Sequence, residues 1–217
     1  MDEVAFQRHK SYITSYECVS AVGKALPPLV VFKNRGVEDG WVKENMPGHN
    51  DYILFDNHAS KLKPKKLIDK WLKEIILPKT VPANKDGWRL LIWDDNTAHD
   101  KWGYAKLFEQ HKVRLVTMHC ETVHFSAPVE STYTPEVKDK LSKLYKTTSI
   151  DEDKGEGYEH RWLKMIHEAR TETFALENHK KAWIETGCFP PDEDTLYKQA
   201  NEKRIKKPKS QWVIMAV

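Results

Sequence analysis

Apolar and polar residues alternate near the start of the chain in a manner typical of β-strands. Residues 11–22 (SYITSYECVSAV) carry β-branched and aromatic side chains in rough alternation, Gly-Lys follows at 23–24, and LPPLVVF occupies 26–32. This pattern predicts a β-hairpin whose two prolines begin the second strand, where a missing backbone N–H is tolerated. A short strand is expected next, at 52–55 (YILF).

The hydrophobic period then changes from two residues to about 3.6. Residues 63–76 place apolar side chains at helical spacing, and this helix is expected to end at Pro78. Two apolar runs, 88–96 (WRLLIWDDN) and 113–118 (VRLVTM), are predicted to be buried strands with a helix over 101–111 between them. Such a strand–helix–strand unit with short links predicts an α/β fold with a partly parallel sheet.

The last third of the chain is predicted to be helical. Residues 127–147 indicate a helix interrupted near Pro135, and 159–186 indicate further helix with Gly187 as its C-cap. The stretch SIDEDKGEG between them is acidic and contains glycine, which is typical of a linker. The predicted division is therefore a domain at 1–148, an acidic linker at 149–157, and a helical C-terminal extension with a basic tail at 158–217.

Composition places the chain among globular proteins. Of its 217 residues 40% are hydrophobic and 31% are charged, which is enough to build a core and excludes wholesale disorder. The longest apolar runs are strand-length, so no membrane span is expected, and the first residues lack the pattern of a signal peptide. Three widely spaced cysteines favour a reducing compartment. The net charge of +3 permits nucleic-acid binding without requiring it.

Carboxylates are the first candidates for chemistry. Asp94 and Asp95 end a predicted strand, Glu130 lies near the start of a later helix, and Asp2 precedes the hairpin. In an α/β sheet, the carboxyl ends of strands and nearby helix starts converge on one crevice. Three carboxylates meeting there would form an oxygen-rich site for Mg²⁺ or Mn²⁺. A second interpretation stays open, in which the two aspartates form a turn and helix cap and the glutamate is solvated.

Two sequence blocks add to this interpretation. In RLLIWDDNTAH at 89–99, a hydrophobic strand ends in Asp94 and is followed by His99. In HCETVHFSAPVE at 119–130, a Thr-x-His-x-x-x-Pro pattern leads to an acidic position that Glu130 occupies. Both blocks resemble consecutive motifs of the pogo/Tigger/centromere-protein-B branch of the DDE transposase superfamily.

The two ends of the chain extend this resemblance. The opening MDE resembles the block that carries the first catalytic aspartate of the family, here Asp2. Residues 169–194 resemble the C-terminal block of fungal-type pogo elements. Because Asp2 is the second residue of the sequence, we expect an N-terminally truncated chain that lacks most of the first strand and the family's N-terminal DNA-binding domains.

The resemblance implies a fold, a reaction and a set of site residues. The fold is an RNase H-like mixed sheet flanked by helices, with the first acid on the first strand, the second at the end of the fourth and the third on a later helix. Asp2, Asp94 and Glu130 are implied to be catalytic and to ligate two Mg²⁺ or Mn²⁺ ions in a DNA endonuclease or strand-transferase. One ion activates the attacking oxygen and the other stabilises the leaving oxygen of the phosphodiester.

The resemblance also implies roles for residues near the three acids. Asp95 would add negative charge beside the metal ions, and His124 is expected to shape the loop before the acidic helix. His99 either orients the strand-end carboxylate or a phosphate, or is a plain helix-start histidine. A different class of function stays open, namely a catalytically silent nucleic-acid-binding protein derived from a transposase. Self-association into a homo-oligomer also stays open.

Two basic runs are candidates for contact with DNA. One precedes and begins the first predicted helix, and the other forms the C-terminal tail. Their members are Lys61, Lys63, Lys65 and Lys66, and Lys203, Arg204, Lys206 and Lys207. Either run could contact the phosphate backbone, and the tail could serve as a nuclear localisation signal, which predicts a nuclear protein. A solvated helix start and a merely soluble tail are the alternatives.

Overall fold

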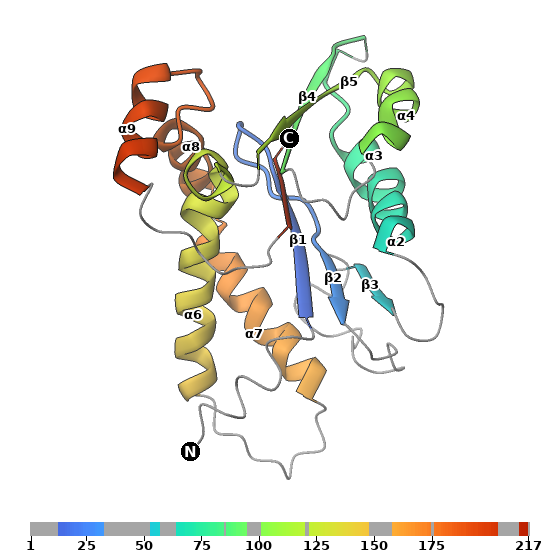
Figure 1. The fold of residues 1–217 in the computed structure, drawn as a ribbon. Coiled ribbons are helices and arrows are strands. Elements are labelled where there is room, and N and C mark those ends of the chain that lie inside the picture. Colours follow the sequence, from blue (N-terminus) through green and yellow to red (C-terminus); the bar gives the residue numbers. More distant parts are fainter. Residues whose placement is uncertain are drawn as a thin grey trace.

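The computed structural model describes residues 13–32, 53–56, 64–84, 86–94, 101–119, 122–147, 158–174, 176–203 and 213–216. These residues form a mixed α/β structure, a central sheet with helices on both faces (Figure 1). The strands are β1 (Ile13–Val19), β2 (Leu29–Phe32), β3 (Ile53–Asp56), β4 (Arg89–Asp94), β5 (Val113–Met118) and β6 (Val213–Ala216). Their order across the sheet is β3-β2-β1-β6-β4-β5.

The sheet combines parallel and antiparallel pairs. β1 pairs antiparallel with β2, and β2 pairs parallel with β3. β4 pairs parallel with β5, as the predicted strand–helix–strand unit requires. Between these two groups lies β6, which is parallel to β1 and antiparallel to β4. The C-terminal strand, which no sequence pattern predicted, therefore joins the two halves of the described sheet.

The predicted hairpin is confirmed. In the register of β1 and β2, Ile13 lies opposite Phe32. The turn between them closes with hydrogen bonds from Ser20 N to Lys24 O (2.8 Å) and from Gly23 N to Ser20 O (3.0 Å). Gly23 has a φ of 91°, a conformation that a residue without a Cβ adopts at no steric cost.

One face of the sheet is covered by helices from the middle of the chain. They are α2 (Pro64–Trp71), the π-helical segment η1 (Leu72–Ile76), α3 (Leu77–Lys79), the 3₁₀ segment η2 (Lys101–Tyr104) and α4 (Ala105–Gln110). The largest core cluster lies here and includes Trp71 and Trp93, both fully buried. Trp71 Nε1 donates to Pro27 O at 2.9 Å, so α2 is fixed to the start of the second hairpin strand.

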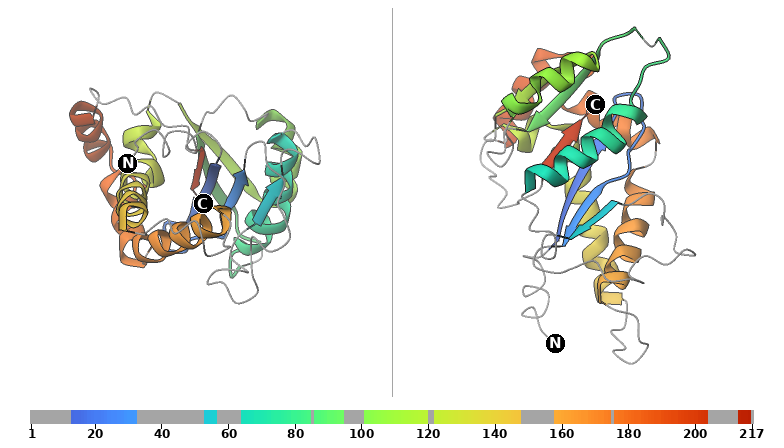
Figure 2. Two further views of the ribbon diagram at one scale, coloured as in Figure 1. Left: turned by 90° about the horizontal axis from the view of Figure 1, so that it is seen from below. Right: turned by 90° about the vertical axis from the view of Figure 1, so that its right-hand side faces the viewer.

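The other face is covered by helices from the second half of the chain (Figure 2). They are α5 (Val123–Ser126), the π-helical segment η3 (Val129–Tyr133), α6 (Thr134–Thr147), α7 (Tyr158–Thr173), α8 (Leu176–Glu185) and α9 (Glu193–Lys203). The stretch predicted as helix over 159–186 is thus two helices, which separate near Phe174. Among the described helices, none has the length and apolar character that a bilayer span requires.

The sequence predicts that Pro78 ends one helix and that Pro135 interrupts another, but neither proline does so. Helical structure runs through Pro78 to Lys79, and α6 contains Pro135 in its first turn. Each proline directly follows the last wide hydrogen bond of a π segment, which Leu77 N–H donates in one case and Thr134 N–H in the other. The spacing of hydrogen bonds changes back to that of an α-helix at this point, so the missing N–H of proline breaks no bond.

The prediction that β4 and β5 are buried strands is wrong for one row of their residues. Leu90 and Val116 are 51% and 46% exposed, because the described helices cover mainly the other face of this pair. Beside them the Arg114 guanidinium lies 4.1 Å from the centroid of the half-exposed Trp88 ring. The central position of β4 is confirmed, whereas β5 lies at the edge of the described sheet.

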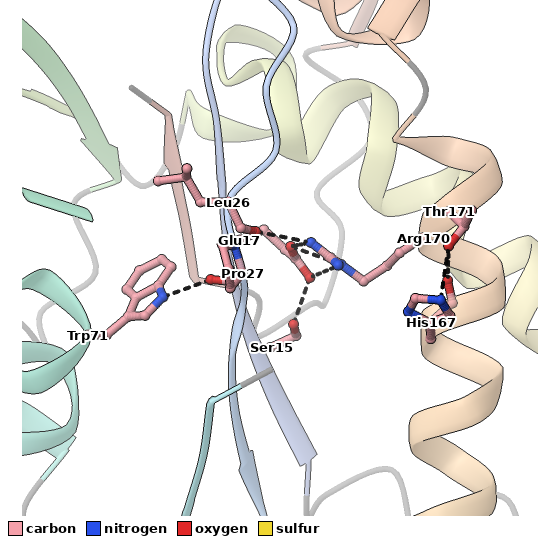
Figure 3. Close-up of polar contacts among 8 residues, drawn as sticks. All are labelled: Ser15, Glu17, Leu26, Pro27, Trp71, His167, Arg170 and Thr171. Atoms are coloured by element: carbon pink, nitrogen blue, oxygen red, sulfur yellow. Dashed lines mark hydrogen bonds and ion pairs between the residues drawn. The ribbon is translucent and has the colours of Figure 1, made fainter. Parts of the chain in front are cut away.

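A buried ion pair crosses from the sheet to α7 (Figure 3). Arg170 donates to Glu17 through Nη2 to Oε2 at 2.8 Å and through Nε to Oε1 at 3.0 Å. Ser15 Oγ donates to the same carboxylate at 2.7 Å. Both charged side chains are about nine-tenths buried. Each charge is therefore balanced by the opposite charge of its partner rather than by water.

We expect Arg170→Met to lower the free energy of unfolding by about 3–5 kcal/mol, because it leaves the Glu17 carboxylate buried without its cation. Denaturant unfolding followed by fluorescence measures this change. Glu185→Gln is the control: it breaks an exposed pair with Lys181 (3.6 Å) and should cost no more than about 1 kcal/mol. Adding Glu17→Gln to Arg170→Met should recover part of the loss; equal losses in Arg170→Met and the control would contradict this account.

Candidate active site

Asp94 occupies the carboxyl end of β4, as the sequence predicted. Its backbone pairs with that of Met118, the last residue of β5. The preceding residue, Trp93, is fully buried and stacks on Tyr104 with ring centroids 5.8 Å apart. Because the Trp93 ring is fixed in the core, the end of β4 has a defined register at the position of the candidate carboxylate.

The end of β5 leads directly to the segment that carries Glu130. Ser126 Oγ of α5 lies 3.7 Å from the Met118 sulfur and also donates to Thr122 O at 2.8 Å. Thr122 closes the preceding turn, with its N–H and its Oγ1 donating to His119 O at 2.8 and 2.9 Å. The described part of the block at 119–130 thus folds into a turn and a short helix, α5, which lies beside the end of β5 and leads into η3.

Glu130 is the second residue of η3, whose N-cap is Pro128. Its Oε2 atom is buried. The segment is anchored by Tyr133, which is fully buried and stacks on Phe174 with ring centroids 4.8 Å apart and planes 13° apart. Burial raises the pKa of the Tyr133 hydroxyl, and the nearby charge of Glu136 raises it further. On its inner side η3 contacts β1 and β6.

His124 lies on α5, six residues before Glu130. Its ring meets that of Phe125 edge-on, with centroids 4.9 Å apart. Its Nε2 atom is buried, and no hydrogen-bond partner for it is found among the described residues. This position agrees with a role in shaping the loop before the acidic helix, and that role stays a prediction.

Several predicted site residues fall outside the described part of the chain. These are Asp2, Asp95, His99, Lys61, Lys63, Arg204, Lys206 and Lys207. For Asp94, Lys65 and Lys203 the structure describes the backbone alone. Lys66 is described and is exposed on α2. Because α2 and η3 pack on opposite faces of the sheet, Lys66 and Glu130 are not brought together.

The predicted ligands, Asp2, Asp94 and Glu130, have the chemistry that a divalent metal ion requires. Carboxylate oxygens are the ligands that Mg²⁺ and Mn²⁺ prefer, and Glu130 has one buried carboxylate oxygen, Oε2. Within the described residues, no group of three or more potential metal ligands is found. The predicted set of Asp2, Asp94 and Glu130 is therefore a proposal for the full chain.

Glu17 of β1 is a buried acid that the sequence pattern did not indicate. It lines a small cleft together with residues of η3, α6 and the end of α7: Val129, Tyr133, Thr134, Val137 and Phe174. The signal in the sequence was an acidic residue in the middle of an alternating strand, where apolar or hydroxyl residues are usual. Its bidentate pairing with Arg170 commits this carboxylate to holding the structure together.

Comparison with protein families gives the class of protein that this fold and site define. A family model described as DDE superfamily endonuclease matches residues 10–186. The match spans both the end of β4 and η3, so the chain belongs to the DDE superfamily endonuclease family. A search of curated proteins and a search of solved structures found no match.

Tyr133 is expected to fix the position of Glu130. Tyr133→Ala should lower the free energy of unfolding by about 3–5 kcal/mol, because it removes a fully buried ring and its stack on Phe174. Tyr133→Phe keeps the stacked ring and should lose less than half as much. Thermal and denaturant melts measure both variants; equal losses would show that the ring does not anchor η3.

Proposed function

We propose that this chain is a DDE-type transposase or endonuclease catalytic domain of the pogo/Tigger/centromere-protein-B branch, acting on DNA phosphodiesters through a two-metal site. The observation that supports the proposal is the position of two acids inside the family match: Asp94 ends β4, and Glu130 lies in the first turn of η3. The mixed sheet supports an RNase H-like arrangement for this domain.

The proposed site has residues that would bind metal ions and residues that would orient groups around them. Asp94 and Glu130, with Asp2, would hold two Mg²⁺ or Mn²⁺ ions. Bound there, the ions would lower the pKa of an attacking water or 3′-hydroxyl and stabilise the leaving 3′ oxygen. Trp93 and Tyr133 keep the two acid-bearing segments in place, because both rings are fully buried. His99, His124 and Asp95 would orient a carboxylate or phosphate beside the ions.

A specific observation also favours the second candidate, a catalytically silent nucleic-acid-binding protein derived from a transposase. On the side of β4 away from β5 the neighbouring strand is β6, and its four residues, VIMA, carry no carboxylate. In both candidates DNA is the partner, and the basic tail supports a nuclear location. The two functions differ in whether the carboxylates perform chemistry, which substitution of Asp94 tests.

Asp94→Asn should reduce Mn²⁺-dependent nicking of supercoiled plasmid at least ~100-fold, because the amide removes one charged ligand of the ions. Asp86→Asn is the matched control: it makes the same chemical change at an exposed acid that pairs with Lys112 at 2.6 Å, and should keep full activity. Equal nicking by the two variants would refute the assignment of Asp94. No nicking by the wild-type chain, together with retained DNA binding, would favour the silent protein.

The lysine run at 61–66, whose last members lie in α2, is proposed to contact the phosphate backbone. Replacing Lys61, Lys63, Lys65 and Lys66 with Gln should weaken DNA binding and reduce the slope of log K against log salt by about 0.9 for each lost phosphate contact. Fluorescence anisotropy over a salt series measures this slope. The control set, exposed on the helices of the opposite face, is Lys143, Lys146, Lys180 and Lys181. A slope change only in the control set would place the DNA on that face.

A further inference from the structure

The strand β5 has a hydrogen-bonding edge that no described segment covers. β5 is the last strand on its side of the described sheet, and β4 is the neighbour with which it pairs (Figure 1). Among the described residues, no backbone hydrogen bond joins the far side of β5 to another segment. The backbone groups along this edge are therefore available to pair with a further strand.

β5 has few of the features that keep sheet edges from pairing. Edge strands are usually protected by lysine, proline, a β-bulge or short length. β5 (VRLVTM) has six residues with neither lysine nor proline, and it pairs with β4 at every position without a bulge. The strand at the other described edge, β3, has four residues and ends with Asp56. β5 is thus the less protected of the two described edges.

An exposed row of side chains adds an apolar surface beside this edge. Alternate residues of a strand point to the same face, and the register places Leu90 of β4 in one row with Arg114 and Val116 of β5. Leu90, Val116 and Trp88, which directly precedes β4, are each about half exposed. Covering this row removes apolar surface from water, which favours association.

The charges around the exposed row are paired, which bears on what covers it. Arg114 Nη1 lies 3.3 Å from Glu109 Oε2, and Lys112 Nζ lies 2.6 Å from Asp86 Oδ1. A phosphate backbone is attracted by an excess of lysine and arginine, and these two pairs provide none. The balance of charge, together with the uncovered edge, favours a protein strand over a nucleic acid.

Two copies of β5 fit each other when they run antiparallel about a two-fold axis. Such a pairing places one residue opposite its own copy and the others in reciprocal pairs. With Val116 at the axis, Arg114 lies opposite Met118 of the second copy, and Leu115 lies opposite Thr117. No like charges then face each other, and two exposed valines cover one another. Placing Arg114 at the axis would instead bring two arginines together.

We propose that β5 is a dimerisation surface, on which β5 of a second copy of this chain pairs antiparallel with Val116 opposite Val116. The two described sheets would then form one continuous sheet, with both exposed rows on the same face. This inference concerns assembly, and it does not depend on the proposed chemistry. Residues 114–118 make a short ladder, so the dissociation constant is expected to be on the order of micromolar.

Sedimentation velocity of the full chain, from about 1 to about 200 µM, tests for this dimer. The wild-type chain should change from monomer to dimer over this range. Val116→Lys should weaken dimerisation at least tenfold, because it places two ammonium groups opposite each other. Val22→Lys is the matched control, since it makes the same change at an exposed residue of the hairpin turn, and it should dimerise like the wild type.

A disulfide across the axis tests the register, and it gives an answer even if Val116→Lys does not fold. Val116→Cys should form a disulfide between two copies under mild oxidation, since directly opposite strand residues lie within disulfide range. Thr117→Cys is the control: residue 117 is also exposed, but in this register it lies opposite Leu115 rather than its own copy. Peptide mapping separates these disulfides from any that involve the native cysteines.

Several outcomes would overturn the proposal. One is a wild-type chain that stays monomeric at every concentration, and another is equal dimerisation of Val116→Lys and Val22→Lys. Equal yields of the disulfide at positions 116 and 117 would refute the register. If the chain is monomeric and Trp88→Ala weakens binding of a single-stranded oligonucleotide, the exposed row contacts nucleic acid and not a second copy.

Discussion

The buried pair of Glu17 and Arg170 is the constraint on which this structure depends. It joins the centre of the sheet to α7 in a region where neither charge would be stable alone. From Arg170 the contacts continue outward, since its guanidinium carbon lies 4.8 Å from the centroid of the Phe174 ring, which in turn stacks on Tyr133 of η3. Glu130 therefore takes its place from a line of contacts that begins at a strand on the other side of the cleft.

The two candidate acids are positioned by different physical means. Asp94 takes its position from strand register, because β4 is held by pairing on both sides and by the buried Trp93. Glu130 lies in a π-helical segment, where wider hydrogen bonding allows Pro135 to follow without breaking the helix. An ordinary α-helix over the same residues would change the rotation of Glu130 relative to α6, because a π turn holds more residues than an α turn.

Membership of the DDE superfamily endonuclease family fits this arrangement of a mixed sheet with acids at strand and helix ends. The unexpected element is β6, which holds the two halves of the described sheet together.

Local sequence patterns were enough to predict most of the secondary-structure elements and the candidate carboxylates. Alternation predicted the hairpin, and a short apolar run ending in acids predicted β4 with Asp94 at its end, because these patterns reflect interactions between near neighbours.

Features that depend on contacts between distant parts of the chain became visible only in the folded structure. Glu17 and Arg170 are 153 residues apart, so no local pattern reveals their pairing. Likewise, four apolar residues at the C-terminus are compatible with any buried element, and only the open edges of β1 and β4 make them a strand. The exposed row of β4 and β5 was missed for the same reason, since apolar character does not tell which face a distant helix will cover.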